Sequence, residues 1–170
     1  MSVLDVIKKR RSVRKFLPKP VEDDKLMRVL EAGRLAPAAN NAQQWKFIVV
    51  RDKGLLEKLA PACGGQSFVA EAPAALVVCA IGDERMMYCG QPAATVDCSI
   101  ALSFMILEAA ELGLGTCWLG YFNNDKVKRV LNIPAENNVV AVSPLGYADG
   151  EPPARPRKGI DEVVTYDGWK

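Results

Sequence analysis

The chain carries at residues 10–16 the stretch Arg10-Arg11-Ser12-Val13-Arg14-Lys15-Phe16, and the expected fold is built around it. Three arginines and one serine fall within five positions, directly after the first expected helix. A guanidinium matches two phosphate oxygens at once, and a serine hydroxyl adds a further donor. If helical geometry continued to Arg10, Arg14 would be its i+4 neighbour and both could reach one anion. The stretch therefore indicates a phosphate-binding site.

Two other interpretations fit the same residues. Cations in the last turn of a helix interact favourably with the negative end of the helix dipole. A basic stretch can also be part of a nucleic-acid-binding surface, and most such stretches are simply solvated. These residues alone leave the three interpretations open.

Length and charge narrow the class of protein. With 170 residues, 49% of them hydrophobic, the chain is expected to form one domain with a substantial core. The 22 basic and 20 acidic residues give a net charge of +2, which argues against a general polyanion binder. No apolar run looks long enough to cross a bilayer, and residues 1–5 lack the layout of a signal peptide. We therefore expect a cytoplasmic protein that does not interact with membranes or nucleic acids.

The chain lacks histidine, which excludes Ser-His and Cys-His nucleophilic catalysis. An enzyme with this composition is expected to rely on a cofactor for its chemistry. The odd cysteine count and the absence of a C-x-x-C pair predict free thiols and no metal site, with Cys79 and Cys98 in the core. The cysteines are Cys63, Cys79, Cys89, Cys98 and Cys117.

Hydrophobic periodicity predicts the elements of the first half of the chain. A capping box at Ser2 opens a short helix with Val3, Val6 and Ile7 on one face. A second helix starts at Glu22 or Asp23 and is ended by Pro37. Its expected buried stripe is Leu26, Val29, Leu30 and Leu35. Strands are expected over 43–50 and 74–80, a short helix over 55–60 and a loop over 83–91.

The second half begins with a long helix from Pro92 to about Leu112, with Gly113 as its C-cap. It is apolar almost all round, so we expect it in the middle of the molecule or at a subunit interface. A helix capped by Asn123 and ending near Leu131, a strand over 139–147 and a last short strand over 163–166 follow. Residues 152–158 read as an extended arm with a second basic cluster.

The loop Gly113–Gly120 allows two interpretations. It fails as a dinucleotide fingerprint, because the third glycine is missing and a helix precedes it. It could let a flat ligand approach the backbone closely, or it could be a structural turn with Trp118 anchored in the core. Together with the other elements it predicts α+β layers around a modest sheet, with a C-terminal arm stabilised by a partner subunit.

These stretches together resemble the nitroreductase family of FMN flavoproteins, and the resemblance runs from Val3 to Tyr166. No single motif is decisive, but their order and spacing are specific and favour the phosphate interpretation of 10–14. The motifs are Arg10–Phe16, then Pro37-Ala38-Ala39-Asn40-Asn41-Ala42-Gln43-Gln44-Trp45, Ala72-Pro73, Gly113–Gly120 with Phe122, and Arg155-Pro156-Arg157-Lys158.

The resemblance implies a central, mainly antiparallel sheet flanked by helices, in an intertwined homodimer that exchanges the arm 151–170. It implies two FMN sites at the interface. Arg10, Ser12 and Arg14 would hold the phosphate, ribityl chain and pyrimidine edge, with Arg11 beside them and Arg155 and Arg157 completing the phosphate grip. Pro37, Ala38, Ala39 and Asn41 of the other subunit would line the ring. Trp118, Leu119 and Gly120 would run along its opposite side, with the Gly120 N–H near flavin N5.

The sequence departs from the family pattern in three places. Pro37-Ala38-Ala39 lacks a hydroxyl common at this loop, and Gln44 stands where a proline often precedes Trp45. Residues 83–91 also leave little room for the helical insertion that covers the flavin in larger members. These departures affect the expected substrate more than the expected cofactor.

The resemblance implies an FMN-dependent oxidoreductase without a side-chain acid or base. Hydride would pass from NAD(P)H to flavin N5 and then, by a ping-pong mechanism, to nitroaromatics, quinones or related electrophiles. An FMN-binding redox sensor, storage or electron-relay protein is the alternative, and a nucleic-acid module a third, disfavoured by the near-neutral charge. The acceptor and the choice between NADH and NADPH stay open.

Overall fold

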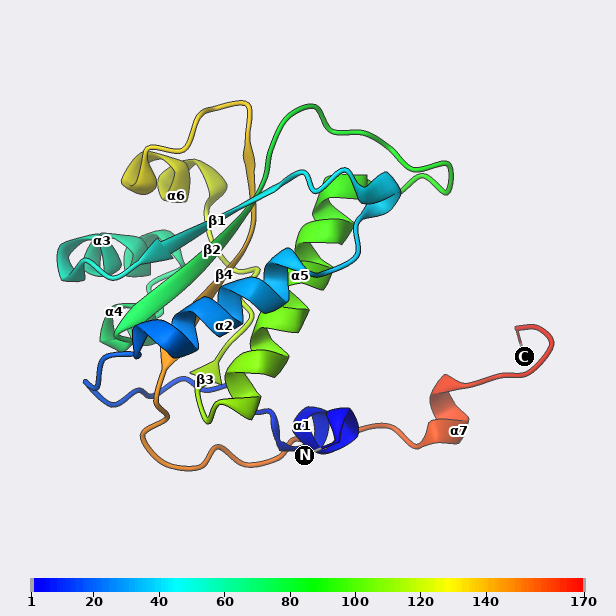
Figure 1. Ribbon diagram of the computed structural model, residues 1–170, viewed down its shortest axis with the longest axis horizontal. Coiled ribbons are helices and arrows are strands. Elements are labelled where there is room, and N and C mark those ends of the chain that lie inside the picture. The colour runs from blue at the N-terminus through cyan, green and yellow to red at the C-terminus, as the bar shows by residue number, and fades with distance from the viewer. Residues whose placement is uncertain (1, 170) are drawn as a thin grey trace.

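The computed structural model describes residues 2–169 and shows a four-stranded sheet between two groups of helices (Figure 1). The strand order is β1-β2-β4-β3, and each neighbouring pair is antiparallel. The predicted antiparallel α+β fold is confirmed. The strands are β1 (Trp45–Val50), β2 (Ala74–Ala80), β3 (Gly115–Thr116) and β4 (Asn138–Gly146). The helices are α1 (Val3–Lys9), α2 (Asp23–Arg34), the 3₁₀ turn η1 (Ala39–Asn41), α3 (Lys53–Ala62), α4 (Phe68–Glu71), α5 (Ala93–Glu111), α6 (Asn124–Leu131) and α7 (Ile160–Val163).

The central strand β2 is buried on both faces, as its unbroken apolar sequence requires. Its Val77 pairs with Ile48 of β1 and Val142 of β4. Helices α3, α4 and α6 cover one face of the sheet, and α2 and α5 cover the other (Figure 1). Leu59 anchors the first layer and Leu102 the second, both with no exposed surface. The sheet therefore separates two apolar layers.

Helix α5 is the long apolar helix that the sequence predicts, and Gly113 follows it with a left-handed φ of 76°. By length and composition alone it could cross a membrane, so the expectation that no segment could do so is too broad. Half of its apolar window is buried inside the protein.

Helix α1 ends one residue earlier than the phosphate interpretation assumed. The capping box of Ser2 and Asp5 is confirmed, but Arg10 is the C-cap with φ −53° and ψ 132°. The prediction that Arg10 and Arg14 are i+4 neighbours on one helix is therefore wrong. Of the predicted apolar face only Val6 is buried, while Val3 and Ile7 are exposed.

Three further predictions need correction. Leu35 is exposed because α2 ends at Arg34 and turns away from the layer that buries Leu26 and Val29. The first strand starts at Trp45, since Gln43 has a left-handed φ of 51°. Residues 163–166 form no strand: α7 occupies 160–163, and the arm leaves the body where no strand edge could pair with it (Figure 1).

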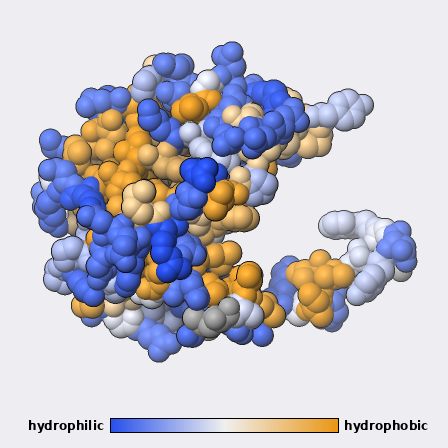
Figure 2. Space-filling view, viewed as in Figure 1, coloured by the Kyte–Doolittle hydropathy of each residue, from blue (hydrophilic) through white to orange (hydrophobic). Residues whose placement is uncertain are grey.

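The arm beyond β4 is exposed at every described residue from Pro153 to Trp169. It projects from the body, and Figure 2 shows a hydrophobic patch on it around α7. The hydrogen bonds of α7 are local, such as Gly159 N–H to Glu162 Oε2 at 2.6 Å. The large exposed apolar side chains of the arm are Ile160, Val163, Val164, Tyr166 and Trp169.

Candidate functional site

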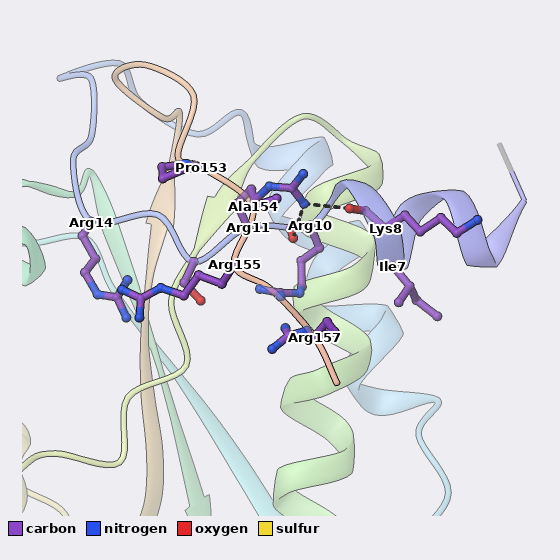
Figure 3. Close-up of a pocket in the computed structure, with 10 residues that line it drawn as sticks. Ile7, Lys8, Arg10, Arg11, Arg14, Pro153, Ala154, Arg155 and Arg157 are labelled. Carbon is purple, nitrogen blue, oxygen red and sulfur yellow. Dashed lines mark hydrogen bonds between the residues drawn. The ribbon is translucent and has the colours of Figure 1, made fainter. Parts of the chain in front are cut away.

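A cavity of about 450 Å³ lies between the segment after α1 and the start of the arm (Figure 3). Its lining includes five arginines and one lysine and no acidic side chain. The structure therefore brings together the two basic clusters that lie at opposite ends of the sequence. The lining residues are Ile7, Lys8, Arg10, Arg11, Ser12, Arg14, Pro153, Ala154, Arg155 and Arg157.

The segment 10–14 is held to the body by its backbone. Val13 N–H donates to Thr116 O at 2.8 Å, and Ser12 forms a parallel bridge with Thr116. Val13 itself is buried, so its neighbours on either side face the cavity. A Cβ at Gly115 would lie 2.6 Å from Val13 Cγ2, so this close approach requires glycine. Segment 10–14 is thus a fixed wall of the cavity.

The arginines divide into two roles. Figure 3 shows the guanidiniums of Arg14 and Arg155 directed towards each other, with Arg10 and Arg157 on the α5 side. The Arg11 Nη1 atom instead donates to Lys8 O at 2.7 Å and Lys9 O at 3.1 Å. Arg11 therefore interacts with the carbonyl end of α1, as the helix-dipole interpretation proposed.

A second cavity of about 340 Å³ shares Arg10 and Ser12 with the first and continues along α5. Its other lining residues are Ser103, Ile106, Leu107, Thr116 and Trp118. The site therefore leads from a cluster of cations into a partly apolar slot. Sequence reasoning missed Thr116 and the three α5 residues, although Thr116 lies inside the glycine-rich loop that it singled out.

The loop after β3 supplies the far wall of the slot. Trp118 is 43% exposed, so the interpretation of Trp118 as a core anchor is wrong. Leu119 is buried and pairs with Val142, with its N–H donating to Val142 O at 2.9 Å. Gly120 is exposed, and its N–H donates to no protein acceptor within residues 2–169. A backbone donor is therefore available two residues after Trp118, which lines the slot.

The predicted ring-lining residues Pro37, Ala38, Ala39 and Asn41 do not join this site within one chain. They lie near the N-terminal end of α5, where Ala39 N–H donates to Asp97. The slot lies further along the helix, beside Ser103 and Leu107. One chain alone therefore holds the two predicted halves of the ring site apart.

Four of the five cysteines are buried, and burial disfavours their reactive thiolate form. Burial raises the pKa of the Cys63 and Cys79 thiols to about 11 and that of Cys98 to about 12. Burial also raises the pKa of Cys117, against the opposing effect of Arg14. These four thiols are buried, as predicted for Cys79 and Cys98, and Cys89 is exposed. Within residues 2–169 no group of three or more potential metal ligands occurs.

The sequence model of the Nitroreductase family matches residues 7–147. The chain belongs to the nitroreductase family. Its segment 10–14, its sheet and the Gly113–Gly120 loop all lie inside the match, which confirms the resemblance inferred from the motifs.

Individual relatives agree with this assignment. An Archaeoglobus fulgidus protein named "Putative NADH dehydrogenase/NAD(P)H nitroreductase" is 36% identical over 87% of this chain and 86% of its own. A Bacillus subtilis protein named FMN reductase [NAD(P)H] is 29% identical over 96% of this chain and 74% of its own. The solved structure of an FMN-dependent nitroreductase from Clostridium difficile is 32% identical, with a TM-score of 0.85 over 98% of this chain and 99% of that one.

Proposed function

We propose that this protein is an FMN-dependent NAD(P)H oxidoreductase that reduces nitroaromatics, quinones or related electrophiles. The observation that carries the proposal is the arginine-lined cavity that continues into the slot beside Trp118. The names of the relatives, which include an FMN reductase and an FMN-dependent nitroreductase, support the same cofactor.

The residues present fit a phosphate-bearing planar cofactor. None of Arg10, Arg14, Arg155 and Arg157 forms an ion pair with a described residue, so their guanidiniums are available for a phosphate dianion. The slot offers apolar surface from Ile106 and Leu107 on one side and Trp118 on the other. A phosphate and a flat ring could therefore be held together at one site.

When bound, FMN would supply the hydride chemistry, accepting hydride from NAD(P)H and giving it to the acceptor in a ping-pong sequence. The Gly120 N–H would stabilise negative charge at ring atom N5, since it is an exposed donor in the loop whose Trp118 lines the slot. A backbone donor needs no titrating side chain, which agrees with the absence of histidine. Water would supply protons.

We further propose that the working form is a homodimer that exchanges residues 151–170. Exposed apolar side chains on α1, on α5 and on the arm, including Leu4, Phe104 and Ile160, support an interface that one chain leaves uncovered. In such a dimer, residues 37–41 of one subunit would line the ring held by the other. This arrangement would join the two halves of the ring site that a single chain keeps apart.

The deciding experiment is a visible spectrum of the purified protein, with the pigment released by denaturation and identified. We expect FMN in a near one-to-one ratio with chains, and oxidation of NAD(P)H when a quinone or nitroaromatic is added. A colourless protein that also fails to take up added FMN would overturn the proposal. Bound FMN with negligible turnover would instead favour the sensor or electron-relay alternative.

A further inference from the structure

Within the turn at 37–43, the backbone N–H and the backbone C=O of Ala39 are both held by side chains. Ala39 N–H donates to both carboxylate oxygens of Asp97, each at 3.1 Å. Ala39 O accepts a hydrogen bond from Arg85 Nη2 at 3.2 Å. Asp97 is 3% exposed and lies in the second turn of α5, whereas Arg85 is exposed and precedes that helix. Two distant segments thus meet at Ala39.

The turn held in this way has an unusual backbone. Asn40, Asn41 and Gln43 have φ of 55°, 53° and 51°, in the left-handed region that side chains disfavour. Such residues persist only where surrounding contacts over-determine them. The turn's own backbone bonds, such as Asn41 N–H to Ala38 O at 2.9 Å, give it shape but do not fix it to the body. The bond from Ala39 N–H to Asp97 does fix it to α5.

Arg85 belongs to a hairpin built on the same end of α5. Ala93 N–H donates to Arg85 O at 2.9 Å, and Met87 N–H donates to Gln91 O at 2.8 Å. Residues 85–92 are thereby tied to the start of the helix, and Tyr88 is fully exposed on the hairpin. The Arg85 side chain then reaches back to the turn. The hairpin, the turn and α5 form one connected unit.

We propose that Asp97 and Arg85 are positioning residues that form a clamp on the 37–43 turn and hold it rigid where it would line the ring and an acceptor bound beside the ring. This inference rests on the proposed function, under which the turn lines the ring bound by the partner subunit. A buried carboxylate is costly unless hydrogen bonds satisfy it, so its placement on the turn indicates a dedicated contact. Neither residue belongs to the arginine cavity, so cofactor binding and turn position are separable.

The primary test compares the variant Asp97→Ala with the control variant Glu108→Ala. Glu108 is a carboxylate on the same helix that binds Arg28 Nη2 at 2.6 Å, away from the turn. We expect both variants to keep FMN at the wild-type ratio. For Asp97→Ala the KM for a quinone and a nitroaromatic should rise about 10- to 100-fold, the range of one charge-assisted hydrogen bond, with kcat changed less than about threefold. Asp97→Asn, which keeps one oxygen acceptor, should have a KM close to that of the wild-type protein.

A second variant protects the test against misfolding of Asp97→Ala. Arg85→Ala removes an exposed side chain and should raise the same KM about 3- to 10-fold, since water competes for the exposed Arg85 hydrogen bond more than for the buried Asp97 one. Arg129→Ala, an exposed arginine on α6, is the matched control. Unchanged KM values in both Asp97→Ala and Arg85→Ala, with FMN retained, would overturn the proposal.

Hydrogen exchange separates this proposal from the proposed function, because it needs no cofactor. Amides of residues 38–43 should exchange about tenfold or more faster in Asp97→Ala than in Glu108→Ala, whether or not FMN is bound. If the wild-type protein binds no FMN but the two variants still differ in exchange, the oxidoreductase proposal is refuted and the clamp is supported. Equal exchange in the two variants would refute the clamp and leave the oxidoreductase proposal standing.

Discussion

The two segments that supply arginines to the cavity are held in place to different degrees. Segment 10–14 is fixed by Val13 N–H to Thr116 O at 2.8 Å and by the burial of Val13. Arg155 and Arg157 lie on an arm whose described residues are exposed from Pro153 onward. A preorganised group loses little entropy when it binds, whereas a mobile one must first be ordered. Segment 10–14 is therefore expected to supply most of the affinity, and the arm to link affinity to its own docking.

The largest expected effect comes from removing the fixed half. Arg10→Ala with Arg14→Ala should weaken FMN binding about 1000-fold, because two preorganised charge-assisted contacts contribute about 4 kcal/mol together. Fluorescence titration of the apoprotein with FMN measures the change. Arg28→Ala with Arg129→Ala, two exposed arginines elsewhere, is the control. Affinity within about threefold of wild type would remove segment 10–14 from the site.

Truncating a side chain should lower stability much more in the core than on the arm. Leu59→Ala deletes a fully buried side chain and should lower the free energy of unfolding by about 2 to 5 kcal/mol. Ile160→Ala, at a side chain that is 75% exposed, should change it by less than about 0.5 kcal/mol at concentrations where the chain is monomeric. Urea denaturation measures both. A large loss for Ile160→Ala under those conditions would show that the arm packs on its own body.

The exposed half of the cavity, on the arm, should matter less than the fixed half. Arg155→Ala with Arg157→Ala should weaken FMN binding about 30- to 100-fold, since ordering the arm offsets part of the gain from its contacts. That loss is enough for FMN to be absent after purification, which an absorbance spectrum detects. Lys158→Ala, next to the pair but outside the cavity lining, is the control. Full FMN retention by the double variant would refute the assignment of both arginines.

The smallest effect is expected at Tyr147, just before the arm begins. Its hydroxyl donates to Glu22 Oε2 at 2.6 Å. This hydrogen bond is the largest of the contacts that lower the pKa of the Glu22 carboxyl from 4.5 to about 2, and Lys19 adds to the effect. A depressed carboxyl pKa stabilises the fold above pH 4.5, and this contribution is lost as the pH falls towards 2. Tyr147→Phe should therefore be slightly less stable than wild type at pH 6, with the difference shrinking between pH 4.5 and 3. Thermal denaturation across this range, with Tyr121→Phe as control, measures it; a constant difference would contradict the linkage.

Local and family patterns predicted most of the fold, and non-local contacts account for the errors. The apolar run of β2 and the side-chain cap at Asn123 are local signals, and both were confirmed. Residues 163–166 carry the composition of a strand, but a strand also needs a partner edge, which a sequence pattern does not reveal. Leu35 fits the helical period, yet lies beyond the end of α2.

The site shows the same division. The convergence of segment 10–14 with Arg155 and Arg157 followed from the family motifs, because no pattern in one chain places its two ends together. The role of Arg11 depends on where α1 ends, within a residue or two, and boundaries are weakly encoded. Asp97 was missed because a carboxylate in a mostly apolar helix gives no sequence signal of the distant amide that it binds.

The bridge between Ser12 and Thr116 has a consequence for when the site is assembled. Segment 10–14 needs β3, β3 needs its pairing with the end of β4, and the second pair of arginines follows β4 in the chain. Contacts so distant in sequence form late, and a chain grows from its N-terminus. A ribosome-bound chain therefore cannot close the cavity until residues 155 and 157 have emerged. Binding of the cofactor by the closed cavity would then report that synthesis of the chain has passed residue 157.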